Sequence, residues 1–317
     1  MTPVSTDNAD QSAAAVPAGW GPGARSPGVW WRAARPFTLP ASVVPIVVGG
    51  ALAWREGVFH PLRFVLALVA SLLVQAAVNF VDEYSDHDRP AGALKHIAPY
   101  KVIARGELTS KGVRGGTIVS LAVASAIGIY LIAVTHWILL AVCLASVAAV
   151  YFYAGGPRPL GHAGVGVPLV FVFMGIVMVA GAEFIHTERW SAAVLWIALP
   201  VACLVSAILV ANDLRDMEED RAEGKRTAVT AWGRPAGWWL WTLLVAAAYL
   251  VILAWALVHE YLWTPVLVAP SLPLAVRAGH SLWRSEDRET LAQGLRRTAL
   301  LHLAFGILLS IGLVLGG

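Results

Sequence analysis

Residues 195–211, LWIALPVACLVSAILVA, contain no charged side chain, and the sixteen residues that follow, NDLRDMEEDRAEGKRT (212–227), contain six carboxylates and four cations. An uninterrupted apolar run is typical of a helix that crosses the hydrocarbon core of a membrane. The abrupt change predicts that such a helix leaves the membrane near residue 211 and that many acidic groups gather at its exit.

Composition extends this interpretation to the whole chain. Of the 317 residues, 58% are hydrophobic and 14% are charged, whereas an average soluble domain has about 25% charged residues. The apolar runs are unbroken and do not alternate with polar residues, so the spans are predicted to be helices and the protein an all-α membrane bundle. Nine spans are expected, at roughly residues 39–54, 62–80, 116–134, 137–153, 165–182, 192–211, 238–258, 262–276 and 300–315.

The positive side chains predict the orientation of this bundle. With the N-terminus in the cytoplasm and nine alternating spans, all of the 23 Lys and Arg residues except Arg55, Arg63 and Arg189 fall on the cytoplasmic side, as the positive-inside rule requires. We therefore expect a multi-pass protein of the plasma (inner) membrane whose acidic exits face the cytoplasm. The net charge of +3 is attributed to contact with anionic membrane lipid, and no nucleic-acid partner is expected.

One domain, residues 29–317, is expected after a disordered tail, residues 1–28. The tail is rich in Ala, Pro and Gly and lacks the apolar segment of a cleaved signal peptide. Cys143 and Cys203 lie in different expected spans with no neighbouring Cys or His partner. Both are therefore interpreted as small apolar residues of the spans.

A second acidic cluster is predicted at the exit of the span 62–80, on the same side of the membrane. This exit reads QAAVNFVDEYSDHDRP (75–90), and its Asn79, Asp82 and Asp86 are spaced i, i+3 and i+7. Side chains with this spacing share one face of a helix. The exit is therefore expected to present one amide and two carboxylates in a row.

The cluster at 212–227 has a similar pattern. Asn212, Asp216 and Asp220 are spaced i, i+4 and i+8, and Asp213 lies beside them. Like charges at i, i+4 destabilise a helix by roughly a few tenths of a kcal/mol per pair unless a cation lies between them. Oxygen-only ligands suit Mg²⁺, which takes one or two carboxylates together with phosphate oxygens. Two facing clusters are therefore predicted to hold Mg²⁺ ions that bridge to a diphosphate.

Basic side chains near both clusters are predicted to complete the diphosphate site from the protein side. They are Lys101, Arg105, Arg158, Arg215, Lys225 and Arg226. Charges also crowd at helix exits that simply meet water. This solvated role is expected for Glu107, Glu218, Glu219 and Glu223. Similar spacing in two separate loops favours metal binding for Asp82, Asp86, Asp216 and Asp220.

These motifs resemble the UbiA superfamily of intramembrane prenyltransferases, which are nine-helix bundles with two Asp-rich motifs on cytoplasmic loops. NDLRDMEEDRAEGKRT is similar to the second motif and is the most specific of the matches. ARPFTLPASVVPIVVG (34–49) resembles the entry into the first helix, and YFYAGGPRPLGHAGVGVPLVFVFMG (151–175) resembles the fourth loop. The branch that looks most similar serves menaquinone synthesis and prenylates 1,4-dihydroxy-2-naphthoate.

The resemblance implies a reaction and a set of residues. Mg²⁺, expected as two ions, and basic residues hold a polyprenyl diphosphate, which ionises toward an allylic cation. An electron-rich carbon of an aromatic, dihydroxynaphthoate-like acceptor then attacks that cation, while the prenyl tail lies in a lipid-facing tunnel. Catalytic roles fall on Asp82, Asp86, Asp216 and Asp220, and metal binding on these four and Asp213. Substrate binding falls on Asn79, Lys101, Arg105, Arg158, Asn212, Arg215, Lys225 and Arg226, with Arg35 and Tyr153 near the acceptor.

Two departures from the family pattern leave alternatives open. The first motif usually reads NDxxD, but Asp82 and Glu83 stand in place of its Asn and first Asp. Gly166-Val167 stands where the menaquinone branch commonly has Gly-Glu. A different acceptor therefore remains an alternative, as does a terpene cyclase in which the prenyl chain's own double bonds capture the cation. A transporter is disfavoured, because its ionisable groups would be expected inside the spans near the midplane.

Overall fold

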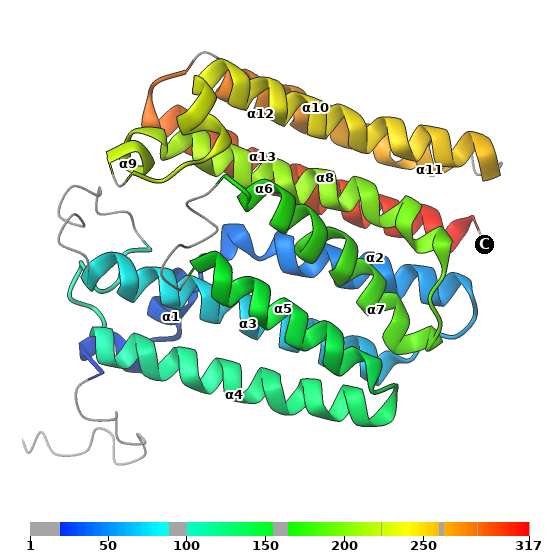
Figure 1. Cartoon of the computed structure of the whole chain (residues 1–317), viewed down its shortest axis with the longest axis horizontal. Coiled ribbons are helices and arrows are strands. Elements are labelled where there is room, and N and C mark those ends of the chain that lie inside the picture. Colours follow the sequence, from blue (N-terminus) through cyan, green and yellow to red (C-terminus); the bar gives the residue numbers. More distant parts are fainter. Residues whose placement is uncertain are drawn as a thin grey trace, which may run out of the picture.

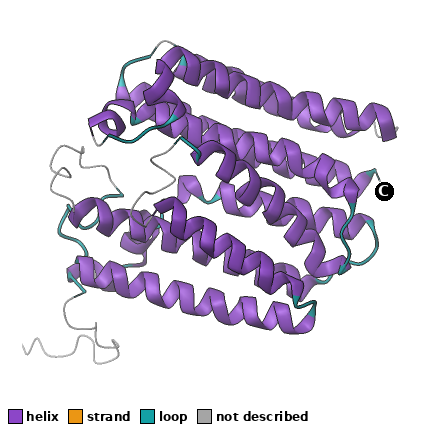
Figure 2. Cartoon of the chain, viewed as in Figure 1, coloured by secondary structure: helices purple, strands orange, loops and turns teal. Residues whose placement is uncertain are grey.

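The computed structural model describes residues 20–88, 100–154, 164–222, 224–259, 263–283 and 285–316, with the backbone alone at residues 86, 88, 149–154 and 259. Helices make up the regular structure of these residues, and the long helices lie side by side along one direction (Figure 1, Figure 2). The prediction of an all-α protein with long apolar helices is confirmed.

The order of the helices follows the expected spans. Three short helices come first: η1 (Pro22–Arg25), α1 (Pro27–Ala33) and η2 (Pro36–Thr38). The N-terminal half continues with α2 (Pro40–Arg55), α3 (Pro61–Asp88), α4 (Ser110–Val134) and α5 (Ile138–Ala154). The C-terminal half contains α6 (Gly166–Leu169), the π-helix η5 (Val170–Val177), α7 (Met178–Thr187), α8 (Ala192–Arg215), α9 (Met217–Ala222), α10 (Ala228–His259), α11 (Trp263–Val268), η6 (Ala269–Ser271), α12 (Leu272–Leu282) and α13 (Arg288–Leu315).

Seven helical segments of the described chain are long and apolar enough to cross a membrane. They coincide with the expected spans other than the fourth and the eighth. The fourth corresponds to α5, which has 17 residues. The eighth is divided among α11, η6 and α12, where Pro270 and Pro273 lack the N–H groups that a continuous helix needs. The count of nine spans therefore stays a prediction.

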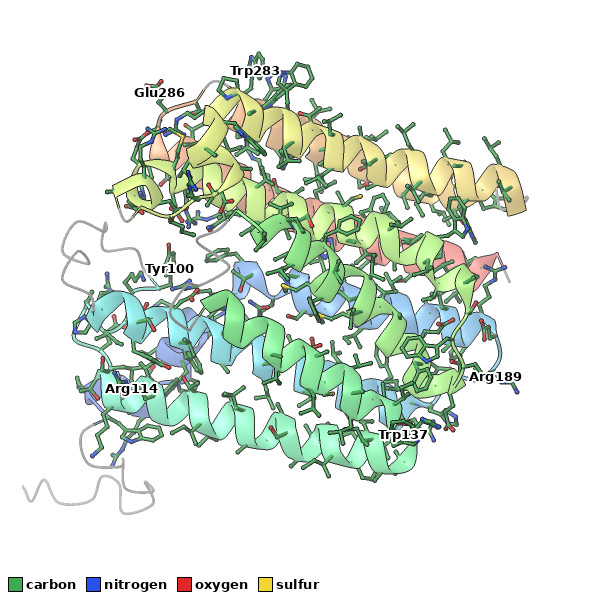
Figure 3. The ribbon with its side chains drawn as sticks, in the orientation of Figure 1. Tyr100, Arg114, Trp137, Arg189, Trp283 and Glu286 are labelled. Carbon is green, nitrogen blue, oxygen red and sulfur yellow. The ribbon has the colours of Figure 1, made fainter. Side chains whose placement is uncertain are left out.

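Both acidic clusters lie at one end of the bundle, here called the acidic end, which contains the last turns of α3 and the short helix α9 (Figure 1). Among the labelled side chains, Tyr100, Arg114 and Glu286 lie toward this end, and Trp137 and Arg189 lie at the opposite end (Figure 3). The first described residues are at the acidic end, and the C-terminus is at the other (Figure 1). The fold thus brings together two motifs that are more than a hundred positions apart in the sequence.

Helix α8 forms the centre of the larger hydrophobic core, with its buried face made mainly of Ala, Val and Leu. It packs against α2, η5, α10 and α13. The contact with η5 is close because Gly175 lies directly against Ala202. Within a bilayer, small residues stabilise helix pairs by letting their backbones approach, since lipid gives little hydrophobic drive for association.

Replacing Gly175 by Ala is expected to lower the melting temperature of the protein in detergent. The added Cβ would lie 2.2 Å from the Cβ and 2.3 Å from the Cα of Ala202, so η5 and α8 would have to move apart. Overpacking of this kind costs about 1–3 kcal/mol. Gly181→Ala is the matched control, because no neighbouring group lies within 4 Å of its added Cβ. Equal melting temperatures for the two variants would contradict the close contact.

The folded chain begins earlier than the predicted boundary at residue 28. Residues 1–19 of the predicted tail lie outside the described residues, but residues 20–28 form η1 and the start of α1. The carbonyl of Trp20 accepts a hydrogen bond from Thr109 N at 3.1 Å, and Gly23 N donates to Glu107 O at 2.8 Å. The Trp20 ring also packs edge-on to Trp30 at 6.0 Å between centroids. These contacts hold in place a segment that was predicted to belong to the tail because of its Pro and Gly content.

Candidate active site

The first cluster is built around a buried carboxylate, Glu83, whose side chain is 1% exposed. Its Oε2 lies 3.6 Å from Lys101 Nζ and 3.9 Å from Arg35 Nη2, and its Oε1 accepts a hydrogen bond from Ile103 N at 3.1 Å. Arg35 also donates to Asp82 at 3.2 Å, and its guanidinium lies 4.9 Å from the centre of the Tyr100 ring. Of the two adjacent acids, Glu83 therefore points inward, whereas the side chain of Asp82 is 53% exposed.

Asn79 joins the start of this cluster to the segment before α2. Its amide nitrogen donates to Ala34 O at 2.7 Å and to Thr38 Oγ1 at 2.9 Å. One turn deeper, Gln75 accepts a hydrogen bond from Ser42 Oγ at 2.8 Å. Polar contacts therefore continue from the first motif into the interface between α2 and α3, where an unpaired amide would be costly. The Asp86 side chain is not among the described atoms, although its backbone belongs to α3.

The second cluster is divided between two helices, so the helical face predicted for Asn212, Asp216 and Asp220 is interrupted at Asp216. Helix α8 ends at Arg215, and Asp216 is the residue after it, with φ −100° and ψ 11°. Asp220 belongs to the separate short helix α9. The i+8 spacing assumed an unbroken helix. The backbone instead bends at Asp216, although Asp216 N and Asp220 N still donate to Asn212 O and Asp216 O at 3.0 Å and 2.9 Å.

Arginine holds the Asp216 carboxylate in place. Arg215 Nε donates to one Asp216 oxygen at 2.7 Å and Arg215 Nη2 to the other at 2.5 Å, while the same Nη2 donates to Asn212 Oδ1 at 2.8 Å. Lys225 Nζ lies 3.2 Å and 3.3 Å from the two oxygens of Asp220, which is 7% exposed. The predicted residues of this motif are therefore brought together as carboxylate–cation pairs.

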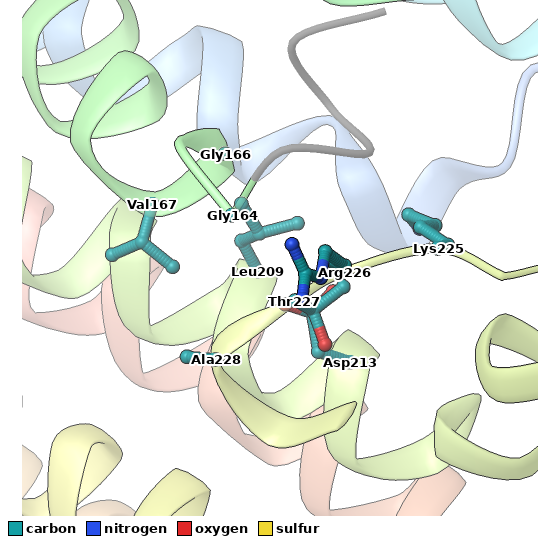
Figure 4. Close-up of a pocket in the computed structure, with 9 residues that line it drawn as sticks. All are labelled: Gly164, Gly166, Val167, Leu209, Asp213, Lys225, Arg226, Thr227 and Ala228. Atoms are coloured by element: carbon teal, nitrogen blue, oxygen red, sulfur yellow. The ribbon is translucent and has the colours of Figure 1, made fainter. Parts of the chain in front are cut away.

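A small pocket lies beside these pairs. It is lined by Gly164, Gly166, Val167, Leu209, Asp213, Lys225, Arg226, Thr227 and Ala228 (Figure 4). Asp213 is buried on α8, and the figure shows it next to Arg226 and Thr227. Val167, the residue that departs from the family's Gly-Glu pattern, thus forms part of the wall of the same pocket as Asp213. The side chain at position 167 can therefore affect which ligands fit in the pocket.

Arg288, at the start of α13, joins the second cluster although the sequence analysis did not select it. Its Nη2 donates to Asp216 Oδ1 at 3.3 Å, and its two terminal nitrogens donate to Glu219 at 2.7 Å and 3.1 Å. Glu219, expected to be solvated, is instead an ion-pair partner whose side chain is 20% exposed. Asp287 accepts a hydrogen bond from Thr290 N at 2.8 Å, and this N-cap is the local signal that could have placed Arg288 at a helix start.

Of three other predicted residues, only Arg105 has a described side chain, and its printed contact lies outside the two clusters. Arg105 is exposed and donates through Nε to Glu107 at 3.0 Å. Hydrogen bonds from Arg105 and from Arg32 hold the pKa of Glu107 below its usual range. Arg158 lies outside the described residues, and the Tyr153 side chain is not described, although Tyr153 belongs to α5. Their predicted contacts with diphosphate and acceptor stay predictions.

The donor set suits Mg²⁺ even though the carboxylates are dispersed. Among the described residues, no three His, Cys, Asp or Glu side chains are close enough to form a metal centre by themselves. Mg²⁺ does not require such a centre, because it usually takes one or two protein carboxylates and completes its shell with water and phosphate oxygens. Asp213, Asp216 and Asp220 supply oxygen donors beside cations suited to a diphosphate. The residues therefore fit a metal–diphosphate site.

The chain belongs to the UbiA prenyltransferase family, which its residues 42–311 match, and it is a prenyltransferase. It is 32% identical to the 1,4-dihydroxy-2-naphthoate octaprenyltransferase of Mycobacterium leprae, over 91% of this chain and 97% of that protein. The protein of the same name from Haemophilus influenzae is 29% identical, over 91% of this chain and 96% of its own length.

A solved structure supports the same fold. The UbiA homologue from Archaeoglobus fulgidus, bound to GPP and Mg²⁺, aligns with a TM-score of 0.62 over 89% of this chain and 99% of that chain. The two sequences are 16% identical, so this likeness concerns the fold. The predicted bundle is therefore of the UbiA type.

Proposed function

We propose that the protein transfers a polyprenyl group from an allylic diphosphate to 1,4-dihydroxy-2-naphthoate in menaquinone biosynthesis. The observation that carries this proposal is the gathering of paired carboxylates and cations from α3, the 100–108 loop, α8 and α9 at one end of an apolar bundle. Relatives that carry the naphthoate octaprenyltransferase name align with nearly the whole chain, which supports this choice of acceptor.

The residues of the acidic end have distinct roles in this reaction. When Mg²⁺ is bound, Asp213, Asp216 and Asp220 on one side and Asp82 and Asp86 on the other would hold two ions, which neutralise charge on the diphosphate. Arg215, Lys225 and Arg226 donate to the diphosphate from the second motif, and Lys101 donates from the loop after α3. Fixed donors of this kind stabilise the charge that develops as the allylic C–O bond breaks and its electron pair leaves with the diphosphate.

The rest of the bundle protects the cation and supplies the acceptor. Apolar helices exclude water from the allylic carbon and surround the prenyl tail. A ring carbon of the acceptor provides the electron pair of the new C–C bond, and that carbon then releases a proton, or carbon dioxide if it carried the carboxylate, to restore the aromatic ring. Arg35, whose guanidinium lies against Tyr100, is proposed to face the acceptor together with Tyr153. Val167, which lines the Asp213 pocket, is proposed to influence which aromatic acceptor binds.

The membrane arrangement is part of the proposal. We place the acidic end in the cytoplasm and let the chain cross the plasma membrane nine times. The excess of Lys and Arg in the loops of this end supports that orientation. The two ends of the described chain also lie at opposite ends of the bundle, as an odd number of crossings requires (Figure 1).

A transfer assay tests the function directly. The purified protein in nanodiscs is given radiolabelled geranylgeranyl diphosphate and Mg²⁺, with or without 1,4-dihydroxy-2-naphthoate, and EDTA serves as the control. We expect a prenylated naphthoquinol, detected as the quinone after oxidation by air, only when acceptor and Mg²⁺ are both present. A lipid product formed without acceptor would replace the proposal by a terpene cyclase. A product formed only with another aromatic acceptor would retain the enzyme class and overturn the naphthoate assignment.

A further inference from the structure

The short helix α9 depends on its neighbours for its position. It has six residues, Met217–Ala222, and a helix of this length is not stable on its own in water. It follows Asp216, the residue that caps α8, and carries Asp220, so its orientation sets the direction of the Asp220 carboxylate. Packing supplies part of the constraint, because Met217 is 6% exposed. Polar contacts with other helices add to it: Arg234 on α10 lies 3.5 Å from Glu218, and Arg288 on α13 contacts Glu219.

Arg288 provides the contact from α13. Its two terminal nitrogens bind the two oxygens of Glu219 in a forked arrangement, at 2.7 Å and 3.1 Å. Planar forked pairs of arginine and carboxylate are stronger and more directional than single ion pairs. The same guanidinium reaches Asp216 at the longer distance of 3.3 Å. One side chain thus connects α13, the turn and α9.

The division of contacts around Asp216 gives these two residues different tasks. Arg215 already binds both Asp216 oxygens, at 2.7 Å and 2.5 Å. Arg288 adds one longer contact, because Glu219 engages both of its terminal nitrogens. The contacts with Glu219 therefore hold Arg288 beside Asp216, and Arg215 remains the main hydrogen-bond donor to the Asp216 carboxylate. This arrangement orients the carboxylate and engages both terminal nitrogens of Arg288 in contacts with the protein.

We propose that Arg288 and Glu219 form a positioning pair that holds α9, and with it Asp216 and Asp220, in the geometry that binds the metal–diphosphate group. The proposal rests on the proposed function insofar as the second motif binds that group. Neither residue is assigned a contact with substrate. What matters is the attraction between positions 219 and 288, whichever of the two carries the positive charge.

Charge exchange tests this statement. Full-length wild-type protein, R288E, E219R and the double variant R288E/E219R are titrated in nanodiscs with Mn²⁺ and inorganic diphosphate, and free Mn²⁺ is followed by EPR. Each single variant is expected to weaken Mn²⁺ binding by about 10–100-fold, as is usual when a group that supports a metal ligand is lost. The double variant is expected to recover to within about 3-fold of the wild type, because coupled residues are not additive.

The matched control lies in the same helix. Arg221 pairs with Glu218 at 3.2 Å, but both side chains are largely exposed, at 53% and 65%. R221E is expected to leave Mn²⁺ binding and prenyl transfer close to the wild-type values, since exposed pairs contribute little. Because charge reversal can unfold a protein, R288Q, E219Q and their double variant are measured alongside. Positioning predicts that the neutral double variant binds no more weakly than the weaker of its single variants.

Several outcomes would overturn the positioning pair. Wild-type affinity in R288E or E219R would show that the contact has no effect on the site. A double variant as weak as R288E would show that the positive charge at position 288 acts on the ligand itself. No Mn²⁺–diphosphate binding by the wild type would remove the site that the pair is proposed to hold. The titration contains no acceptor, so a failed naphthoate assay beside a coupled charge exchange would reject the proposed function alone.

Discussion

Asp216→Ala is expected to lower kcat/KM for prenyl transfer by at least about 10²–10³-fold, the loss typical of removing one group that stabilises developing charge. Asp216 is the carboxylate on which Arg215 and Arg288 converge at the turn between α8 and α9. Its removal takes an oxygen donor from the proposed metal site and removes the acceptor that the two arginines share. The measurement is a radiolabelled transfer assay over a range of Mg²⁺ concentrations.

The fold is expected to survive this substitution. Arg215 keeps its hydrogen bond to Asn212 at 2.8 Å, and Arg288 keeps its forked pair with Glu219. The melting temperature of Asp216→Ala should therefore stay near that of the wild type. Glu286→Ala, an exposed change in the loop before α13, is the activity control. Full transfer activity in Asp216→Ala would reject its assignment as a metal ligand.

Glu83→Ala is expected to cause the largest loss of stability among single changes at the first cluster. Glu83 is 1% exposed and faces Arg35 and Lys101, whose side chains are 13% and 12% exposed. Removing one partner of a buried ion pair typically costs about 3–5 kcal/mol, because the remaining charge stays buried. The Ile103 N–H would also lose its acceptor. The measurement is denaturant or thermal unfolding in detergent micelles.

Two neighbouring variants make this result specific. Glu83→Gln keeps an oxygen that can accept from Ile103 N, so its loss of stability should be smaller than that of Glu83→Ala. Asp82→Ala removes the adjacent acid, whose side chain is 53% exposed and which pairs with Arg35 at 3.2 Å. An exposed pair contributes about 0–1 kcal/mol, so this variant should be nearly as stable as the wild type. Equal losses in Asp82→Ala and Glu83→Ala would contradict the inward placement of Glu83.

The sequence predicts best those features that depend on local composition. Apolar runs identify the long helices because crossing a membrane requires hydrophobic length, a property that each segment carries by itself. The exit of α8 into a dense acidic run is predicted for the same reason, and α8 does end at Arg215. The interruption of the eighth span coincides with its prolines, whose missing N–H groups act locally.

Features that depend on three-dimensional contacts were less accessible. Asp82 and Glu83 are adjacent acids, and hydropathy does not indicate which of them turns toward Arg35 and Lys101. The helical spacing of Asp216 and Asp220 assumed a continuous helix, but the chain turns at Asp216. Arg288 is 69 positions from Glu219, so no local pattern links the two. Such long-range contacts decide whether the charged residues at a helix exit form an ordered site or are simply solvated.

The anchoring of Trp20 and Gly23 limits how the protein can be shortened for experimental work. These residues bind the backbone at Thr109 and Glu107, in the segment that follows Lys101. A truncation that starts after residue 26 would remove both contacts and free one side of that segment. Affinity tags are therefore best fused ahead of Trp20 with a spacer. Amide hydrogen exchange at Thr109 would report whether a shortened protein has kept the native structure of its acidic end.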